Sequence, residues 1–458
     1  MKAAVVLAAG DGTKIVPFQQ TRQKAALPAC NVPLVRRLAD DLLALGIERL
    51  VVVVGHLGQQ VMHALGGLRG VVFVQQDRPQ GTARAALQAL GYLEQEEEFL
   101  LIYGDIACAR ENIAKLLEGF KSSGAEAAAL VHPLGDERGL DWLCAHVSGQ
   151  RLTGVSGHPR HAHNRLCGVY VLRKSAWDYL RRNPGIFRHV SVGGMPPVEA
   201  EVAESVQLMV EEGKEVLAVE TGDFFVDVDK PWHILEANRR IAEYLFRSLN
   251  EDRIHPTARI SEKAKLGGHV VIGENSVIGE GVEIAGPIWV GRNSRITRGA
   301  IVGGGVVVGD HCGLSDYCLV GGRSVIGDHC HVGHCAEFSG VMFDRARMHH
   351  YCEISGVVGS AADIGAATVC GTLRFDDDEQ VIRIKGRPER PDHGGSCSYI
   401  GDYCRTGVNA TLMPGCRIGP YSLVGPNVVV YDEVAPNTMV LLKQELIEKP
   451  WGPERYGW

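Results

Sequence analysis

Two lysines and a glycine-rich loop near the start of the chain are the residues best suited to chemistry. An apolar run ends in a loop that contains Gly10, Gly12 and Thr13. Lys14 and Lys24 follow this loop. Glycine lets the backbone turn its N–H groups toward an anion where a Cβ would collide, and lysine supplies positive charge. The pattern indicates a site that wraps a polyphosphate, although a glycine-rich turn can also serve only to reverse the chain.

An aspartate at the end of a later apolar run is the sharpest single candidate for a metal ligand. Gly104-Asp105 follows the run FLLIY at 99–103. A carboxylate at the end of a strand, beside a bound triphosphate, is suited to hold Mg²⁺, which prefers oxygen ligands and bridges phosphate oxygens. The alternative is an aspartate that only caps the turn.

Polar residues also surround a predicted helix start. Gln76 follows an apolar run at 71–74, and Gly81 and Thr82 open the helix predicted at 82–90. Free N–H groups at a helix start can bind an anion or a carbonyl edge. The alternative is an ordinary turn that ends in an N-cap threonine.

The elements that must position these residues alternate between strand and helix. Apolar runs at 50–54, 71–74 and 99–103 read as buried strands, and 35–45 and 82–90 have helical spacing. This alternation predicts a doubly wound α/β domain whose ligands bind at the carboxyl ends of the strands.

Composition sets bounds on the whole chain. Its 458 residues, 45% of them hydrophobic, allow two or three packed domains. A net charge of −7 argues against nucleic acid as a partner. The 13 cysteines lack the CxxC spacing of zinc ribbons and fit free thiols in a reducing compartment. The first apolar run is too short for a signal peptide or membrane span, so we expect a cytoplasmic protein without membrane contact.

The second half follows a six-residue period. Aliphatic residues recur at every sixth position from Ile254 to Phe338, and small residues follow four positions later. Such a repeat builds a parallel β-helix. The period covers about 254–430, and it predicts interruptions near 339–357 and at 373–399. Cys330 falls on a small inward position, which favours a core role over the alternative of a zinc site with its histidine neighbours.

The first half resembles the sugar-1-phosphate nucleotidyltransferases. The likeness rests on LAAGDGTK and TRQKAALP, with Lys14 where arginine is usual and Gln23 where proline is usual. It implies that Lys14 and Lys24 are catalytic, that a glutamine and a Gly-Thr pair read a pyrimidine of UTP, and that Asp227 joins Asp105 on one Mg²⁺. The implied nucleotide-binding residues are Leu7, Ala9, Gly10, Gly12, Thr13, Gln76, Gly81 and Thr82.

The same resemblance places a sugar pocket farther along the chain. Gly168, in LCGVY, matches a family strand that contacts the sugar. His158, in GHP, stands where the family carries a lysine for the sugar phosphate. With an ordinary pKa near 6.5, histidine would carry charge only part of the time.

The second half resembles the left-handed β-helix of hexapeptide acyltransferases, and its motif order is similar to archaeal-type bifunctional enzymes. Those enzymes pair the nucleotidyltransferase with an acetyl-CoA-dependent amino-sugar-1-phosphate acetyltransferase of UDP-N-acetylglucosamine synthesis. The resemblance implies that His349 is the acetyl-transfer base. The implied acetyl-CoA and amino-sugar ligands are His350, Lys385, Arg387 and Asn409. Thr372 stands where the family has asparagine.

The prediction is therefore an α/β doubly wound nucleotidyltransferase domain followed by a left-handed parallel β-helix of hexapeptide repeats. We expect the domain at 1–230, a linker helix at 231–253, the β-helix at 254–443 and a tail at 444–458. The expected substrates are a sugar phosphate, a nucleoside triphosphate and acetyl-CoA, and the β-helix is expected to form a homotrimer. Two alternatives stay open: a non-catalytic regulatory or structural member of the same family, and an enzyme with a single activity whose other domain is scaffold.

Overall fold

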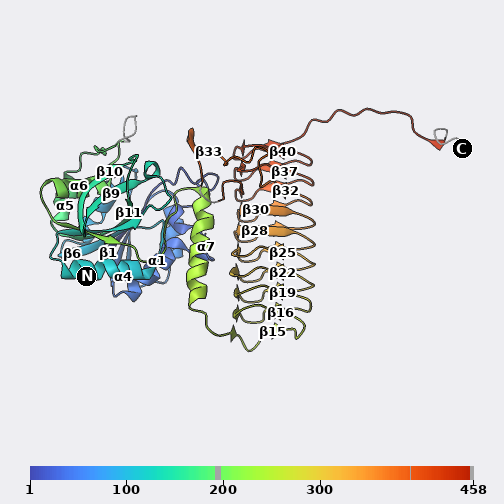
Figure 1. The fold of residues 1–458 in the computed structure, drawn as a ribbon, viewed down its shortest axis with the longest axis horizontal. Coiled ribbons are helices and arrows are strands. Elements are labelled where there is room, and N and C mark those ends of the chain that lie inside the picture. The colour runs from blue at the N-terminus through green and yellow to red at the C-terminus, as the bar shows by residue number, and fades with distance from the viewer. Residues whose placement is uncertain (191–197, 392–393, 454–458) are drawn as a thin grey trace.

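The computed structural model describes residues 1–190, 198–391 and 394–453. The last five residues of the predicted tail lie outside the described residues. The chain folds into an α/β domain and a tall stack of β coils, which lie on either side of the helix α7 (Figure 1). The predicted combination of a doubly wound domain and a left-handed parallel β-helix is confirmed.

A nine-stranded sheet forms the centre of the first domain, in the order β5-β4-β1-β6-β11-β8-β12-β10-β9. The first four strands in this order are mutually parallel, and β11 runs antiparallel to β6. Their bounds are β1 (Ala3–Ala8), β4 (Arg49–Val54), β5 (Val71–Gln75), β6 (Glu98–Tyr103), β8 (Ala127–Pro133), β9 (Leu143–Ser148), β10 (Arg151–Gly157), β11 (Asn164–Arg173) and β12 (Val216–Glu220).

Helices and short elements surround this sheet, and two apolar clusters fill its two faces. The strands and helices predicted from the apolar runs all occur, with ends that differ by one or two residues. The helical bounds are η1 (Lys24–Ala26), α1 (Leu34–Ala44), α2 (Gly58–Ala64), α3 (Thr82–Gln88), η2 (Leu90–Tyr92), α4 (Arg110–Ser122), η3 (Gly139–Asp141), α5 (Ala176–Arg181), α6 (Val202–Glu211) and α7 (Pro231–Arg247). Two small antiparallel pairs join β2 (Pro28–Ala29) to β3 (Val32–Pro33) and β7 (Ile106–Cys108) to β13 (Phe225–Asp227).

The β-helix climbs back along α7. In Figure 1 the helix descends from the level of β33 and the chain enters the coils at the bottom, near β15. Parallel pairing joins Ile272 to Val290 and Val290 to Val308, so a regular coil takes three of the six-residue repeats. Successive coils therefore rise past α7 and bring late residues back to its first turn. Side chains of α7 contact the coils on this face, as Glu243 does with Arg323.

Three walls form each coil. Two of them make up a sheet of β14 (Arg253–Ile254), β16 (Lys265–Leu266), β17 (Val270–Ile272), β19 (Glu283–Ile284), β20 (Ile288–Val290), β22 (Ile301–Val302), β23 (Val306–Val308), β25 (Leu319–Val320), β26 (Val325–Ile326), β28 (Glu337–Met342), β30 (Glu353–Val358), β32 (Val369–Cys370), β35 (Ser398–Ile400), β37 (Thr411–Leu412), β38 (Arg417–Ile418), β40 (Val429–Val430) and β41 (Glu433–Val434). The third wall contains β15 (Arg259–Ile260), β18 (Val277–Ile278), β21 (Arg295–Ile296), β24 (Gly313–Leu314), β27 (His331–Val332), β29 (Arg347–Met348), β31 (Asp363–Ile364), β36 (Arg405–Thr406), β39 (Leu423–Val424) and β42 (Met439–Val440). A hairpin of β33 (Ile382–Ile384) and β34 (Arg387–Glu389) leaves the stack.

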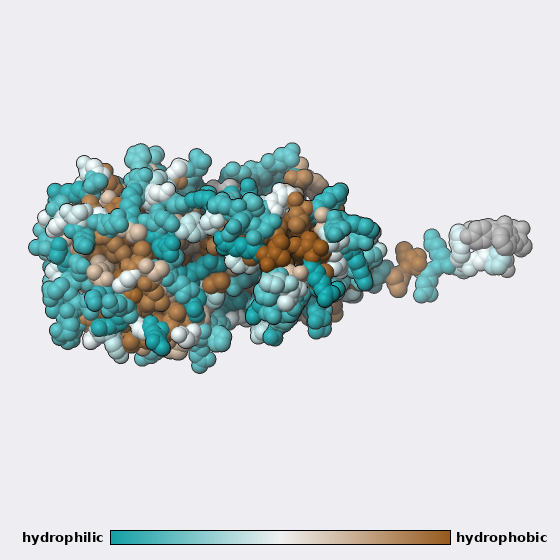
Figure 2. All heavy atoms as spheres, turned by 90° about the horizontal axis from the view of Figure 1, so that it is seen from below, coloured by the Kyte–Doolittle hydropathy of each residue, from teal (hydrophilic) through white to brown (hydrophobic). Residues whose placement is uncertain are grey.

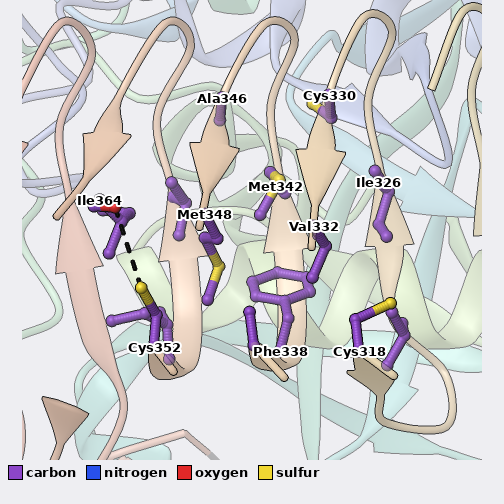
Figure 3. Close-up of a cluster of buried hydrophobic side chains, with 14 of the residues drawn as sticks. Cys318, Ile326, Cys330, Val332, Phe338, Met342, Ala346, Met348, Cys352 and Ile364 are labelled. Atoms are coloured by element: carbon purple, nitrogen blue, oxygen red, sulfur yellow. Dashed lines mark hydrogen bonds between the residues drawn. The ribbon is translucent and has the colours of Figure 1, made fainter. Parts of the chain in front are cut away.

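The repeat positions fill the interior of the coils. Figure 3 shows Ile326, Val332 and Phe338, which come from successive walls of the β-helix, inside the coils together with small residues such as Cys318 and Ala346. Cys330 is buried among them, and its thiol donates to the carbonyl of Phe343 at 3.1 Å. Its thiol therefore points into the core, as its repeat position predicts, and away from the neighbouring histidines.

The predicted interruption near 339–357 is wrong, because the coils continue through it. Strand β28 pairs with β30 from Glu337 opposite Glu353, so this coil is two residues shorter than a regular one. Gly340 lies at φ 133°, and a Cβ there would come within 2.0 Å of the carbonyl oxygen of Gly356. Because β28 pairs with β25 on one wall and with β26 on the next, the chain passes between these walls within β28, at Gly340, without the extra residues of a regular corner. The shortened coil breaks the six-residue period without breaking the stack.

The two domains pack against each other through apolar and ionic contacts. The rings of Phe18 and Phe343 meet edge to face, with centroids 5.6 Å apart. The guanidinium of Arg22 lies 4.4 Å above the Phe343 ring and donates to Asp402 Oδ1 at 2.9 Å. The hydroxyl of Thr21 donates to the other oxygen of Asp402 at 2.7 Å. Asp402 is buried, and its carboxylate binds two residues of the first domain, so it holds the two domains together.

Both ends of the β-helix leave apolar residues exposed. At the lower end Ile254 is 44% exposed, and Figure 2 shows apolar side chains there from below. After β42 the chain extends away from the body, and its exposed apolar residues are Leu441, Leu442, Leu446, Ile447 and Trp451.

We expect Asp402→Ala to lower the free energy of unfolding by about 3 kcal/mol, because it leaves the guanidinium of Arg22 without its carboxylate at a buried interface. Urea denaturation measures the change. The control is Asp316→Ala, which removes the exposed partner of Arg298 and should cost less than about 1 kcal/mol. Equal effects of the two substitutions would contradict this account of the interface.

Candidate functional site

The predicted phosphate loop follows β1 at the carboxyl edge of the parallel strands. Leu7 and Ala9 are buried, whereas Gly10 and Thr13 face solvent. Gly12 lies at φ 60°, and a Cβ there would come within 2.9 Å of Lys24 Cγ. The position therefore needs glycine for two reasons, the left-handed backbone and the close approach of a lysine.

Lys14 and Lys24 meet at one carboxylate. Lys14 Nζ lies 3.1 Å from Asp229 Oδ2, and Lys24 Nζ lies 3.4 Å from Asp229 Oδ1. Lys24 also lies 2.8 Å from Asp105 Oδ2. The pKa of Lys14 is raised above its ordinary value, with the charge of Asp229 as the largest cause. Burial opposes the charge of Lys24, but Asp105 and Asp229 outweigh it and raise the pKa of Lys24. Both lysines are therefore cationic at neutral pH.

The two predicted metal ligands come together through a short strand pair. Strand β13 ends at Asp227, which lies opposite Ile106 of β7. Val228 N–H donates to the carbonyl of Asp105 at 3.1 Å. Burial raises the pKa of Asp227, and the charges of Asp105 and Asp229 raise it further, against a lowering by Lys24. Asp105 and Asp227, remote from each other in sequence, thus share one electrostatic environment.

These carboxylates fit the ligand chemistry of Mg²⁺. Mg²⁺ binds to proteins through one or two carboxylates together with substrate phosphates. The ammonium of Lys24 already lies against Asp105, which shows that this carboxylate faces a position able to hold a cation. A cation bound here would also favour the ionised form of Asp227, whose pKa burial raises.

Gln23, which stands where the resembled motif has proline, holds the loop together. Its amide nitrogen donates to the carbonyl of Ala8 at 2.8 Å, and its oxygen accepts from Ala25 N–H. Gln23 is almost fully buried. The side chain therefore links the end of β1 to η1, the short helix that begins with Lys24.

The predicted base-reading residues have different surroundings. Gln76 lies directly after β5, at the same edge as the loop. A Cβ on Gly81 would come within 2.4 Å of Ala200 N, so the position is closed to larger residues. Thr82 Oγ1 donates to Glu201 at 2.7 Å and accepts from Val202 N–H at 2.8 Å. The hydroxyl of Thr82 is thus occupied within the protein, which leaves backbone groups to contact a base.

The predicted sugar-binding residues lie on the far side of β6. Gly168 of β11 lies at φ 67°, and a Cβ there would come within 2.4 Å of the Tyr103 ring. His158 Nδ1–H donates to the carbonyl of Leu140 at 2.9 Å. Burial lowers the pKa of His158 below its ordinary value, and Lys14 and Arg387 lower it further. His158 is therefore neutral at pH 7 and does not supply the charge that a lysine would give.

A cavity of about 970 Å³ lies between the domains beside Asp227. Arg165 is buried in its wall, with its guanidinium 4.0 Å from the Trp142 ring centroid. The ring of His233 also stacks on Trp142, with ring centroids 5.7 Å apart. Its Nδ1 accepts from the N–H groups of Asp229 and Lys230, and burial lowers the pKa of His233 to about 3. A neutral His233 therefore fixes the backbone of Asp229 and Lys230, just before α7 begins.

His349 and His350 lie at the end of β29, on a corner of the β-helix. The rings of His349 and His331 stack with centroids 4.5 Å apart. His350 Nδ1 lies 2.9 Å from His334 Nδ1. Burial lowers the pKa of His349, and His350 lowers it further. His349 is therefore neutral at pH 7, which is the form that can accept a proton.

The other predicted ligands of the second site are spread over two regions. Asn409 and His350 share one corner, because Ala367 N–H donates to the His350 carbonyl and Asn409 N–H donates to the Ala366 carbonyl. Lys385 is exposed at the turn between β33 and β34. Arg387 instead contacts the first domain, where it lies 2.9 Å from Asp141. Thr372 is exposed and borders the cavity between the domains.

Two residues of this charged cluster were not among those predicted from the sequence. Asp229 contacts Lys14, Lys24 and, at 3.6 Å, Lys230. Burial opposes its charge, but these lysines hold the pKa of Asp229 well below its ordinary value. The signal was present, since Asp229 stands two residues after Asp227 and alternates with apolar residues. The second is Lys230, whose ion-pair partner Glu389 is remote in sequence, so no local pattern links the two residues.

Family models match three parts of the chain. Residues 4–185 match the MobA-like NTP transferase domain. Residues 250–342 match the GMPPB C-terminal domain, and residues 397–432 match six repeats of the bacterial transferase hexapeptide.

Relatives of this chain match it over one or both domains. A bifunctional protein GlmU from Methanococcus maripaludis is 29% identical over 97% of this chain and 98% of its own length. A bifunctional sugar-1-phosphate nucleotidylyltransferase/acetyltransferase from Sulfurisphaera tokodaii is 26% identical over 94% of this chain and 98% of its own. A glucose-1-phosphate thymidylyltransferase from Streptomyces antibioticus is 27% identical over 60% of this chain and 73% of its own. The resemblance indicated by the motifs is therefore confirmed.

We expect the stability of the protein to fall as the pH drops from about 6.5 to about 4. His132 packs against Phe225 of β13, and burial lowers its pKa to about 4. Between the unfolded and folded pKa the unfolded chain binds more protons, so its free energy falls relative to the folded state. His132→Gln should flatten the loss in this window when unfolding is followed by circular dichroism. His56→Gln, at an exposed histidine, is the control and should leave the profile unchanged.

Proposed function

We propose that the chain is a bifunctional enzyme that transfers a nucleotidyl group to a sugar 1-phosphate and an acetyl group to an amino-sugar 1-phosphate. The observation that carries the first activity is the meeting of Lys14, Lys24, Asp105 and Asp227 at the carboxyl edge of the sheet. The relatives with both activities in their names cover both domains of this chain.

In the first reaction an oxygen of the sugar phosphate attacks the α-phosphorus of a nucleoside triphosphate. The bond from the α-phosphorus to its bridging oxygen breaks, and pyrophosphate leaves. Lys14 and Lys24 would bind phosphate oxygens, for which both are fully protonated. Asp105 and Asp227 would hold Mg²⁺, which offsets charge on the leaving group. The protein's main contribution is thus positioning and charge rather than proton transfer.

UTP is the proposed nucleotide, with Gln76 and the backbone near Gly81 beside the base. The thymidylyltransferase relative makes dTTP the second candidate. The cavity next to Asp227 would receive the sugar, where Trp142 and the charged residues of its wall would contact it. Gly168 would serve from outside this cavity, by letting the Tyr103 ring pack against β11. His158 would contact the sugar phosphate only as a neutral hydrogen-bonding group.

In the second reaction the amine of the sugar attacks the thioester carbonyl of acetyl-CoA. His349 would take the proton of the amine, and the coenzyme A thiol would leave. His350 and Asn409, on the same corner, would bind the substrates. Lys385 is exposed on its turn, and its ammonium would bind a phosphate group of the substrates.

We propose a homotrimer formed through the β-helix and a cytoplasmic location. The parallel coils present long flat walls suited to self-association, and exposed rings line one corner of successive coils, as the stacked pair Tyr403 and Tyr421 shows. All thirteen cysteines lie in the described ranges and are free thiols, which supports a reducing compartment. Within the described ranges, the helices lack the length and apolar character that a membrane span requires.

Pyrophosphate release tests the first activity. With Mg²⁺, UTP and glucosamine 1-phosphate or N-acetylglucosamine 1-phosphate, we expect turnover that Asp105→Asn reduces at least 100-fold, because it removes a metal ligand. Asp40→Asn, on the exposed face of α1, should keep the wild-type rate. A chain that turns over no pairing of UTP or dTTP with a panel of sugar 1-phosphates would favour the regulatory alternative.

Thiol release from acetyl-CoA tests the second activity. With glucosamine 1-phosphate as acceptor, His349→Ala should lower kcat about 100-fold or more, because the amine loses its general base. His329→Ala is the matched control, since His329 stacks on His311 at another corner of the β-helix. If both variants match the wild type, or no acetylation occurs, the β-helix is scaffold for a single activity.

A further inference from the structure

The hairpin of β33 and β34 leaves the β-helix and reaches the first domain. Its two-residue turn, Lys385-Gly386, has φ values of 50° and 80°. Positive φ at both positions matches the twist of a tight antiparallel hairpin. Ile382 pairs with Glu389 and Ile384 with Arg387, so the hairpin holds these side chains in a fixed register.

Apolar contacts anchor the hairpin between the domains. Ile382 and Ile384 are buried in the cluster that also contains Ile15, Val228 and Trp232 of the first domain. Ile15 directly follows Lys14, and Val228 directly precedes Asp229. The hairpin therefore shares one apolar cluster with the two backbone segments that carry the charged residues of the nucleotidyl-transfer site.

The polar side chains of β34 contact the first domain at two points. Arg387 Nη2 donates to the Leu140 carbonyl at 3.2 Å and to Asp141 at 2.9 Å. The same Leu140 carbonyl accepts from His158. Lys230 Nζ donates to Glu389 Oε2 at 2.6 Å, and the two side chains are only 6% and 8% exposed. The second contact is therefore a buried ion pair between residues that are remote in sequence.

The position of Lys230 links this ion pair to the site. Its ammonium lies 3.6 Å from Asp229 Oδ2, farther than its 2.6 Å contact with Glu389. Asp229 Oδ2 also accepts from Lys14 at 3.1 Å. Glu389 thus takes the shorter contact with Lys230 and leaves the carboxylate of Asp229 to Lys14 and Lys24. Without Glu389, Asp229 is the nearest remaining carboxylate for a buried ammonium.

We propose that Glu389 is a positioning residue for nucleotidyl transfer, supplied by the β-helix domain to the site in the other domain. The inference rests on the proposed nucleotidyltransferase activity. Glu389 acts through Lys230 and Asp229 and sets the placement of Lys14 and Lys24. The segment that the sequence motifs assign to acetyl-transfer ligands therefore has a second role, as a part of the first site.

The test compares nucleotidyl and acetyl transfer in the same full-length protein. In Glu389→Gln we expect kcat for nucleotidyl transfer to fall about 10- to 100-fold, a size typical of misplaced catalytic groups. This kcat is expressed per binding-competent site, and calorimetry with MgUTP counts those sites. Acetyl transfer should stay within about twofold of wild type. Glu389→Asp, which keeps the charge, should recover most of the loss.

Two further variants make the result specific. Glu280→Gln removes the charge from an exposed Lys–Glu pair of the β-helix and should leave both activities unchanged. Adding Lys230→Met to Glu389→Gln removes the competing ammonium, so the double variant should have a higher kcat for nucleotidyl transfer than Glu389→Gln alone.

The outcomes separate this inference from the proposed function. A wild-type chain without nucleotidyl transfer overturns the proposed function itself. A wild-type chain that is active, with Glu389→Gln equally active per binding-competent site, overturns only the positioning role. A parallel loss of nucleotidyl and acetyl transfer in Glu389→Gln, with no recovery in the double variant, also overturns it and assigns Glu389 to stability alone.

Discussion

The carboxylate of Asp229 is the point on which the charge arrangement of the first site depends. Burial alone would favour its neutral form, yet three lysines hold it ionised. Each lysine comes from a different segment: the loop after β1, the helix η1 and the residue before α7. The carboxylate of Asp229 therefore holds together three segments that are separate in the sequence, through the side chains of their lysines. Since the third lysine also pairs with the β-helix domain, the packing of the domains and the electrostatics of the site form one system.

Periodicity was enough to predict most of the fold. The parallel strands of the first domain are continuous apolar runs because both of their faces are buried, and the β-helix repeats its inward positions every six residues. Periodicity gave the wrong answer at 339–357 because a tighter corner, with two fewer residues, shortens that coil. The strands of neighbouring coils still pair when a coil is two residues shorter. A count of every sixth residue along the sequence, in contrast, loses its register at that point. The tight corner at Gly340 depends on a φ of 133°, which composition does not reveal.

The site was predictable where its residues belong to one local segment and much less so where they meet across the fold. Lys14 and Lys24 belong to the segment between β1 and β2, and Asp105 follows β6, which is the neighbour of β1 in the sheet, so strand order brings them close together. Thr82 looked available from its place at a helix start, but its hydroxyl is occupied by Glu201 and Val202, which come from another helix. Glu389 carries no local signal at all, because its partner lies in the other domain.

The return path of the coils along α7 has a consequence for how this architecture can vary. Solenoids usually gain or lose repeats freely, since each repeat contacts only its neighbours. Here α7, with 17 residues, spans about 26 Å, and each coil rises about 4.8 Å beside it. Removing one coil below β35 would displace the hairpin from Lys230 by a full step. The stack can therefore gain coils above β35. Below β35 the number of coils is fixed, because the hairpin must reach Lys230 at the start of α7.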